Sequence, residues 1–496
     1  MPLNLASRAQ ASGFWFLRRR LAHALLRRSP SMDVEWERAQ KFAVVLSIVV
    51  GLVGLGGAFV AGWLRPAGLV GNTAIVADKA SGAIYVNVGG RLHPALNLVS
   101  AQLVTGRPDA PAFVSSSDIA NHPKGPTVGI VGAPVATPAV LSPQVSRWAV
   151  CDTAPSTLAG APQVTGIDGA LALGAGSQVL DGGAGALMSY GGQTFVVTSG
   201  VRMAVNVTDR AVAQPLGIEA GRPVVAMSRA LFDAVPAGAP LVVPAVPDAG
   251  APAAADVGFA VVNGVVVVTR DVSTGVDQFY VIAGDGVQPV SAVVAGMLRQ
   301  RDTFGFAAPP RVAPDRIAKI PTRHVLDVDS YPKAPLRLVD SADMSVTCAG
   351  WERGVDERQG RLSLIAARQL PVTDHVGAAV IPLVGGGNGG VQADQVVFGE
   401  GAATFVTTTG TAPDSPERQT LWLFDATGLR YGIPFEGGAM QALGLSKDQA
   451  RLAPWAMLQV WPAGPELSRS AALTLHGSSS SAPGAVSVPA GASEGR

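Results

Sequence analysis

The sequence is short of the residues on which most enzymes and nucleic-acid-binding proteins depend. Charged side chains make up 15% of its 496 residues and aromatic side chains 6%, whereas ordinary soluble domains carry about 25% charge. The formal net charge is +1, so no global field draws the protein to nucleic acid or to acidic partners. Glycine and proline are abundant, with 59 and 37 residues, which predicts short strands and many turns.

Motifs for phosphate chemistry are also missing. No glycine-rich stretch ends in Gly-Lys-Ser or Gly-Lys-Thr, so the backbone cradle and lysine of a P-loop are absent. The run Gly385–Gly390 formally matches GxGxxG. No clear βαβ unit with a following acidic residue accompanies it, which favours a loop over a phosphate site. We therefore expect no cofactor; ATP stays open as a ligand but has no motif to support it.

The residue spacings give no support to a metal site or a catalytic triad. None of the six histidines lies at metal-ligand spacing from a cysteine or another histidine, and no GxSxG sequence frames a serine. His324 could form a catalytic cluster with Asp327 and Asp329. An alternating strand with both aspartates toward solvent is the simpler interpretation. We expect neither catalytic nor metal-binding residues.

What the chain does contain is one long uncharged apolar run, Phe42 to Leu64, between Lys41 and Arg65. A helix of this length reaches about 35 Å, enough to cross a hydrocarbon core of about 30 Å. Only a helix satisfies its own backbone groups in lipid within one segment. We predict a transmembrane helix over residues 42–64 behind a basic head of residues 1–41.

Positive charge is concentrated before the apolar run. Eight lysines and arginines precede it, whereas only Arg65 and Lys79 follow closely. Short flanks rich in lysine and arginine stay in the cytoplasm, so we predict a cytoplasmic head and a periplasmic body over residues 65–475. A cleaved signal peptide is the alternative. It fits less well, because the run is long, begins late and ends at residues 63–66 (WLRP) without a small-residue cleavage site.

The head carries a helical pattern of apolar residues. Phe14, Leu17, Leu21 and Leu25 recur at steps of three and four, and Pro30 ends the pattern. We expect an amphipathic helix that lies on the inner leaflet or on a partner. Its polar face, which would contact membrane lipids or a partner, comprises Arg18, Arg19, Arg20, Arg27 and Arg28.

The apolar run contains small residues at a spacing of four. Gly54, Ala58 and Gly62 form this stripe, and such stripes let membrane helices approach closely. Membrane helices are rich in glycine in any case. A packing face and a simple compositional bias therefore both remain open.

The body shows a weak internal repeat. A β-type run is followed by a glycine turn, an apolar–polar stretch usually with proline, and a helix-like segment. Copies begin at Ala83, Thr194, Gln278 and Leu421. In the third copy Gly284-Asp285-Gly286 predicts a tight hairpin turn, and Ser291 and Ser446 are expected helix N-caps. The pattern predicts an α+β body with about four α/β repeats.

Composition divides the body further. Residues from about Asp327 to Val380 hold Cys348 and several β-like runs, which predicts a central domain. Two segments rich in proline, 235–255 and 301–322, are predicted to be linkers. Residues 476–496 are mostly Ser, Gly, Ala and Pro, and we predict a disordered tail there.

The only two cysteines, Cys151 and Cys348, both lie in the exported body. In an oxidising compartment two thiols in one domain tend to pair. A bridge would close a loop of nearly 200 residues, worth about 4–5 kcal/mol in the chain-entropy model. Two unpaired buried thiols are the alternative.

Several stretches resemble EccB, the single-span membrane component of the type VII (ESX) secretion system of actinobacteria. They are residues 11–25 (ASGFWFLRRRLAHAL), 64–66 (LRP), 89–98 (GGRLHPALNL) and 285–291 (DGVQPVS), together with the two cysteines. The likeness covers most of the chain to about residue 465. It implies a central β-rich domain bridged by the cysteine pair, with four α/β repeats around it.

The resemblance also implies a role and partners. EccB-like proteins sit with EccC, EccD and EccE in an oligomeric inner-membrane complex, and their periplasmic parts associate with one another. A mycosin protease is a further expected partner. We therefore predict a structural subunit of a protein secretion complex. A nucleotide-hydrolysing ATPase, an activity described for the family, and a cell-wall-binding module are the alternatives.

Overall fold

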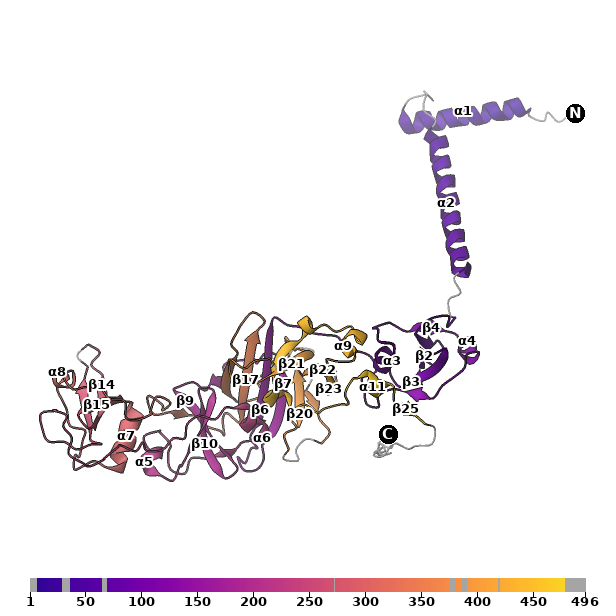
Figure 1. The fold of residues 1–496 in the computed structure, drawn as a ribbon. Coiled ribbons are helices and arrows are strands. Elements are labelled where there is room, and N and C mark those ends of the chain that lie inside the picture. The colour runs from indigo at the N-terminus through magenta and orange to yellow at the C-terminus, as the bar shows by residue number, and fades with distance from the viewer. Residues whose placement is uncertain are drawn as a thin grey trace, which may run out of the picture.

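The protein consists of two N-terminal helices and one long body (Figure 1). The structure, a computed structural model, describes residues 7–28, 36–64, 69–271, 273–373, 380–385, 390–417 and 420–477. Helix α1 spans Arg8–Arg27 and α2 spans Trp36–Leu64. The predicted α+β class, with an apolar helix near the N-terminus and a β-rich body, is confirmed.

Local chemistry explains the ends of the first helix. The Ser7 hydroxyl accepts the backbone N–H of Gln10 at 3.3 Å, and the Gln10 side chain accepts the N–H of Ser7 at 2.9 Å. This capping box satisfies two of the free donors at the helix start. Arg28 adopts a left-handed φ of 53° and ends the helix before Pro30.

A seven-stranded central sheet holds the body together. Its strand order is β19-β20-β7-β6-β17-β18-β8. The bounds are β6 Val145–Thr153, β7 Gln163–Asp168, β8 Ser177–Val179, β17 Val346–Gly354, β18 Arg361–Ala367, β19 Val380–Pro382 and β20 Gln395–Phe398. The central domain is thus wider than residues 327–380, because β6 and β7 come from a distant part of the chain.

The two faces of this sheet pack against different partners. Along β6, Trp148 and Val150 face a core that includes residues of helices α6 and α10, whereas Ala149 and Cys151 face a smaller core. This alternation follows from the two-residue period of a strand. Trp148 packs against Phe424 and Trp461, with ring centroids 5.5 and 6.1 Å away, which ties the sheet to the fourth repeat.

The body contains four repeats with one order of elements, as predicted. They do not surround the central sheet but lie in line with it, the third and second on one side and the fourth and first on the other (Figure 1). Each consists of a three-stranded meander, a helix, an edge segment parallel to the first strand, and a short final helix. The first repeat has β1 Ile75–Asp78, β2 Ile84–Val88, β3 Arg91–Ala95, α3 Leu98–Thr105, β4 Ala112–Val114 and α4 Ser116–Ala120, joined by β5 Thr127–Val128 and β25 Leu475–His476. The second has β9 Ala184–Tyr190, β10 Gln193–Thr198, β11 Val201–Val205, α5 Arg210–Ala213, β12 Val225–Ala226 and α6 Arg229–Ala234, with β16 Arg337–Leu338 added beside β9.

The third and fourth repeats follow the same order. The third has β13 Val266–Arg270, β14 Asp277–Ala283, β15 Gly286–Val290, α7 Ala292–Arg301 and α8 Pro314–Ile317. The fourth has β21 Phe405–Thr409, β22 Leu421–Phe424, β23 Arg430–Ile433, α9 Ala439–Ala442, the 3₁₀ helix η1 Lys447–Gln449, β24 Arg451–Pro454 and α10 Trp455–Leu458, followed by α11 Arg469–Ala472. The predicted copies began at the second strand of each repeat, so the first strand was missed every time.

A proline closes each repeat in the same way. A residue at the start of the third strand, the second strand residue in three repeats and the first in the fourth repeat, donates its N–H to a proline carbonyl at 2.9–3.0 Å: Leu92 to Pro123, Arg202 to Pro236, Val287 to Pro321 and Arg430 to Pro462. The residue two positions after each proline donates back to the same strand residue. Proline lacks an N–H and suits an edge position, so this segment covers the outer edge of the third strand.

The two predicted linkers are parts of these edges. Residue Leu241, in the first of them, is 1% exposed, and its N–H donates to the carbonyl of Ala204 on β11. The second segment contains α8 and the buried Ile317 and Ile320. The linker prediction was therefore wrong, since proline here marks a packed edge and not a flexible connection.

The predicted hairpin turn, helix caps and C-terminal tail can also be compared with the structure. Gly284, with φ of 64°, opens the hairpin turn between β14 and β15, and the Ser291 hydroxyl accepts the N–H of Val294 at the start of α7. Ser446 precedes η1 as its N-cap residue. His476 pairs with β5 and does not belong to a tail, whereas residues 478–496 lie outside the described part of the chain.

Enlarging Gly464 tests the edge closure. A Cβ at this position would lie 2.4 Å from the Tyr431 ring, so Gly464→Ala is expected to lower the free energy of unfolding by about 1–3 kcal/mol through overpacking. Gly174→Ala, which meets no atom within 4 Å, is the matched control. Thermal unfolding of both purified variants measures the effect, and equal melting temperatures would contradict the predicted clash.

Candidate functional site

Helix α2 has the properties of a membrane anchor. Residues Gln40–Gly57 form a stretch long and apolar enough to cross a membrane, the single such helix in the described part of the chain. Its large side chains have no protein cover, with Val45 58% and Leu52 63% exposed. Because water penalises such exposure, this helix requires a lipid or protein environment.

The small residues of α2 lie on one continuous helix. A Cβ added at Gly54 would meet no atom within 4 Å, which leaves that side open to a partner. The surroundings of Ala58 and Gly62 are not described. The stripe thus remains a prediction about packing within a membrane.

The arginines of the head lie on or beside α1. Arg19 and Arg20 occupy the helix side away from Phe14, whereas Arg18 lies only about 40° around the axis from Phe14. The Arg18 guanidinium is 5.4 Å from the centroid of the Trp15 ring. Arg18 therefore borders the apolar stripe and is not on the expected polar face. Arg28 caps the helix, and the Arg27 side chain is outside the described residues.

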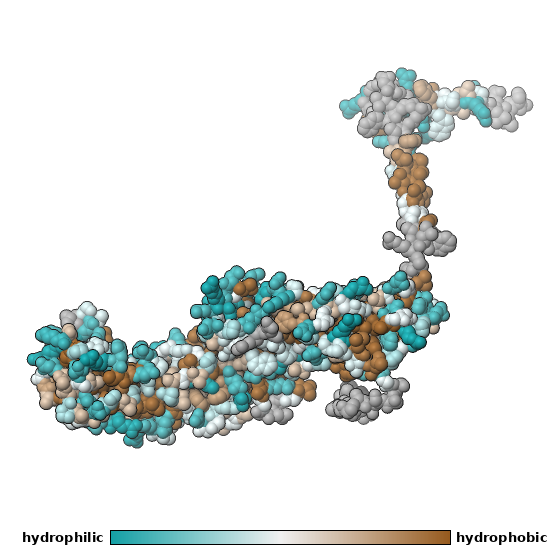
Figure 2. All heavy atoms as spheres, viewed as in Figure 1, coloured by the Kyte–Doolittle hydropathy of each residue, from teal (hydrophilic) through white to brown (hydrophobic). Residues whose placement is uncertain are grey.

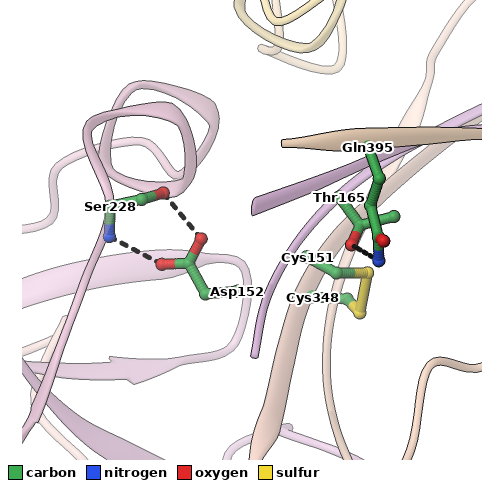
Figure 3. The surroundings of a disulfide bond; sticks show 6 residues. All are labelled: Cys151, Asp152, Thr165, Ser228, Cys348 and Gln395. Carbon is green, nitrogen blue, oxygen red and sulfur yellow. Dashed lines mark hydrogen bonds between the residues drawn. A yellow bond between two sulfur atoms is a disulfide. The ribbon is translucent and has the colours of Figure 1, made fainter. Parts of the chain in front are cut away.

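The two cysteines form a disulfide at the middle of the central sheet. Cys151 on β6 and Cys348 on β17 are directly opposite in the antiparallel ladder, with Cα atoms 4.0 Å apart and an S–S distance of 2.07 Å. Both are fully buried. Beside them the Gln395 side chain donates to the Thr165 hydroxyl at 3.0 Å, which joins β20 to β7 (Figure 3).

Asp152, next to the disulfide on β6, fixes the second repeat to the sheet. Its two oxygens accept the N–H and the hydroxyl of Ser228, each at 2.6 Å (Figure 3). Ser228 is the N-cap of α6. Burial raises the pKa of Asp152 to about 7, and the bonds from Ser228 oppose that rise. One buried carboxyl group thus connects β6 to the first turn of α6.

Asp168, at the end of β7, makes the corresponding link to the fourth repeat. Both of its oxygens lie 2.9 Å from the N–H of Ala403, just before β21. Burial raises the pKa of Asp168 to about 8, because one donor does not compensate a carboxylate for lost water. Burial of Asp168 therefore favours its protonated form.

Two arginines, the half-buried Arg202 and the buried Arg430, occupy the same position in the second and fourth repeats. The Arg202 guanidinium lies 3.7 Å from the ring centroid of Phe232, and that of Arg430 lies 4.1 Å from Trp422 and 5.0 Å from Trp455. Desolvation lowers the pKa of both, that of Arg430 to about 10. These cation–π contacts hold the final helices α6 and α10 on their repeats.

The second and fourth repeats, which adjoin the central sheet, are the inner repeats, and the first and third are the outer repeats. At the position of Arg202 and Arg430, the outer repeats carry Leu92 and Val287, each 1% exposed. The sequence prediction missed both arginines, and only an alignment of the repeats on their closing prolines would have singled them out. The two repeats that adjoin the central sheet thus each carry an arginine that stacks on an aromatic ring.

The structure does not support the catalytic cluster considered for residues 324–329. His324, Asp327 and Asp329 are exposed on an irregular segment, so the solvent-facing prediction holds but the predicted strand does not exist. In the described residues no group of three or more His, Cys, Asp or Glu is placed to hold a metal ion. Residues 386–389 of the Gly385–Gly390 run lie outside the described chain.

A charged pocket of about 450 Å³ in the third repeat is poorly suited to a nucleotide. It is lined by three aspartates that already bind basic side chains: Asp285 with Arg323 at 2.6 Å, Asp256 with Arg316 at 3.5 Å and Asp315 with Lys319 at 3.7 Å. Carboxylates would repel phosphates, and the cations are already neutralised.

An apolar helix long enough to cross a membrane, four proline-closed repeats and a disulfide-bonded central sheet define the class of membrane-anchored repeat proteins. The family model "Type VII secretion system ESX-1, transport TM domain B" matches residues 3–480, and the chain belongs to this EccB family. It is 42% identical over 483 residues to the "ESX-5 secretion system ATPase EccB5" of Mycobacterium tuberculosis (strain ATCC 25618 / H37Rv), covering 96% of this chain and 94% of the relative.

Solved structures show the same architecture. A chain in the "Structure of an intact ESX-5 inner membrane complex" superposes with a TM-score of 0.75 at 40% identity, over 98% of this chain and 99% of that chain. A chain of the "EccB3 dimer from the ESX-3 core complex" gives a TM-score of 0.69 at 33% identity, over 81% of this chain and 100% of that chain.

Removing the disulfide should destabilise the body. Replacing both cysteines, Cys151→Ser with Cys348→Ser, releases a constraint that spans 197 residues of sequence, and the free energy of unfolding is expected to fall by about 2–5 kcal/mol. Denaturant titration of the purified variant measures this. A midpoint equal to that of the native protein would exclude a stabilising role.

Asp168 should make stability depend on pH. Its pKa rises from 3.8 to about 8 on folding, so its contribution is complete below pH 3.8 and is lost as the pH rises toward 8. Unfolding temperatures between pH 5 and 9 should therefore fall with rising pH, and less steeply in Asp168→Asn. Identical slopes for the two proteins would show that Asp168 is ionised in the folded state.

Proposed function

We propose that this protein is a structural subunit of a type VII secretion complex in the inner membrane. Helix α2 anchors it, and its repeat body associates with further copies outside the cytoplasm. The single observation that carries this proposal is an exposed apolar helix joined to a repeat body, in a chain that belongs to the EccB family. Association would use apolar contacts repeated over head, span and body.

The proposed topology places the N-terminus in the cytoplasm and the body in the periplasm. The excess of arginine before Phe42 supports it, as does the disulfide, because such bonds persist in oxidising compartments. Figure 1 shows α1 lying across the end of α2, the arrangement expected of an interfacial helix on the inner leaflet.

The proposed partners are EccC, EccD and EccE, a mycosin-like protease, membrane lipids and other copies of this chain. The EccB chains of the ESX-5 complex and of the ESX-3 dimer support assembly of this kind. The basic head, with its arginines on α1, would contact the cytoplasmic side of the complex. Nucleic acid is not a proposed partner.

An ATPase function is the second candidate, because the relatives' names contain that word. The chain lacks the Gly-Lys-Ser/Thr sequence that holds phosphates, so we propose that it acts without nucleotide. ATP hydrolysis by the full chain in nanodiscs would favour the second candidate. A cell-wall-binding function has no observation of its own.

Cysteine labelling tests the topology. The two native cysteines are buried in a disulfide, so an added cysteine is the only reactive one. A membrane-impermeant maleimide applied to intact spheroplasts should label Gly477→Cys, and should label Ser12→Cys only after permeabilisation. Labelling of Ser12→Cys in intact spheroplasts would reverse the proposed orientation.

Arginine substitution in the head tests the assembly. A triple variant, Arg18→Gln with Arg19→Gln and Arg20→Gln, keeps the basic residues nearest α2, so it should stay in the membrane fraction. It should lose co-purifying subunits, because it lacks arginines proposed to contact them. Arg358→Gln, on the exposed surface of the body, is the control. Undiminished co-purification of the triple variant would contradict a role for the head in assembly.

A further inference from the structure

The body begins immediately beyond the membrane helix. Four residues separate Leu64 at the end of α2 from Leu69, and such a connection extends at most about 18 Å. Val70 is already fully buried, and its N–H donates to the Asp118 carboxylate on α4 at 2.6 Å. The first repeat is therefore held close to the bilayer, whichever side of the membrane the body occupies.

The end of the body near α2 presents large apolar side chains to its surroundings. Leu69 is 56% exposed, and Phe113, on the edge strand β4, is 61% exposed. Figure 1 places β4 and α4 where the chain leaves toward α2, and Figure 2 shows hydrophobic atoms directly at this end. Exposed aromatic and aliphatic side chains at such a position are typical of the membrane interface.

A lysine adjoins these apolar residues. The N–H of Lys79 donates to the carbonyl of Val114, the neighbour of Phe113, at 3.0 Å, and the residue is exposed. The nearby acids are engaged within the protein, since Asp78 accepts the hydroxyls of Ser81 and Ser116 and is 8% exposed. Lys79 thus adds positive charge suited to lipid phosphate.

We propose that Leu69, Lys79 and Phe113, the membrane-proximal face, form a second contact with the bilayer, on the leaflet from which α2 emerges. The apolar side chains enter the headgroup region and the lysine binds lipid phosphate. A contact of this size would be weak alone. The tether through α2 makes it intramolecular, so a high effective concentration keeps it occupied.

Fluorescent labelling of the full chain in nanodiscs tests this contact. Phe113→Cys, labelled with an environment-sensitive dye, should show blue-shifted emission and quenching by headgroup-level spin-labelled lipid about three times that of Phe259→Cys. Phe259, an aromatic residue of the third repeat that is 38% exposed, is the matched control at the far end of the body. Lys79→Cys supplies a second labelling site should Phe113→Cys fold poorly.

The pattern of quenching distinguishes contact with lipid from contact with a second copy of the chain. Strong quenching at positions 113 and 79 with little at 259 supports the membrane contact, and weaker quenching at 113 after Lys79→Glu in nanodiscs containing anionic lipid supports the role of the lysine. Quenching at 113 no stronger than at 259 would overturn the proposal. A blue shift without lipid quenching would assign the face to a second copy of the chain and overturn it equally.

Discussion

The antiparallel pairing of β6 with β17 is the constraint on which the rest of the body depends. These two nine-residue strands bring together segments almost two hundred residues apart, and the disulfide joins them at the third residue pair from one end. One face of the resulting sheet supports α6 and α10 of the inner repeats, and Asp152 and Asp168 hold those repeats at its borders. Without this pairing the two inner repeats would lose the sheet against which their final helices pack.

The four repeats divide into two kinds. The second and fourth repeats, the inner pair, each carry an arginine stacked on an aromatic ring of the final helix or of the meander. The outer pair carries a buried aliphatic residue at that position. A desolvated cation is tolerated where aromatic faces and carbonyl groups surround it, as the Trp461 carbonyl does for Arg430 at 2.9 Å. The distinction follows position in the body, since both inner repeats pack against the central sheet.

Local sequence signals predicted much of this architecture. The membrane helix, the hairpin at Gly284, the cap at Ser291 and the number of repeats were all recognisable from composition and turn chemistry. The expected bridge between Cys151 and Cys348 already placed β6 near β17, but their nine-residue antiparallel register was not recognisable, because no local period encodes register. The buried carboxyl groups of Asp152 and Asp168 were missed for a related reason: acidic residues are expected at the surface unless a specific partner is known.

The proline closures have a consequence for crowded assemblies. A bare strand edge offers a row of hydrogen-bonding groups to any neighbouring chain. In every repeat the outer edge of the third strand is already occupied by the chain's own proline segment. Neighbouring copies therefore cannot add a strand beside the third strand of any repeat. At these edges, dense packing of the bodies carries no risk of the cross-strand pairing that leads to fibres.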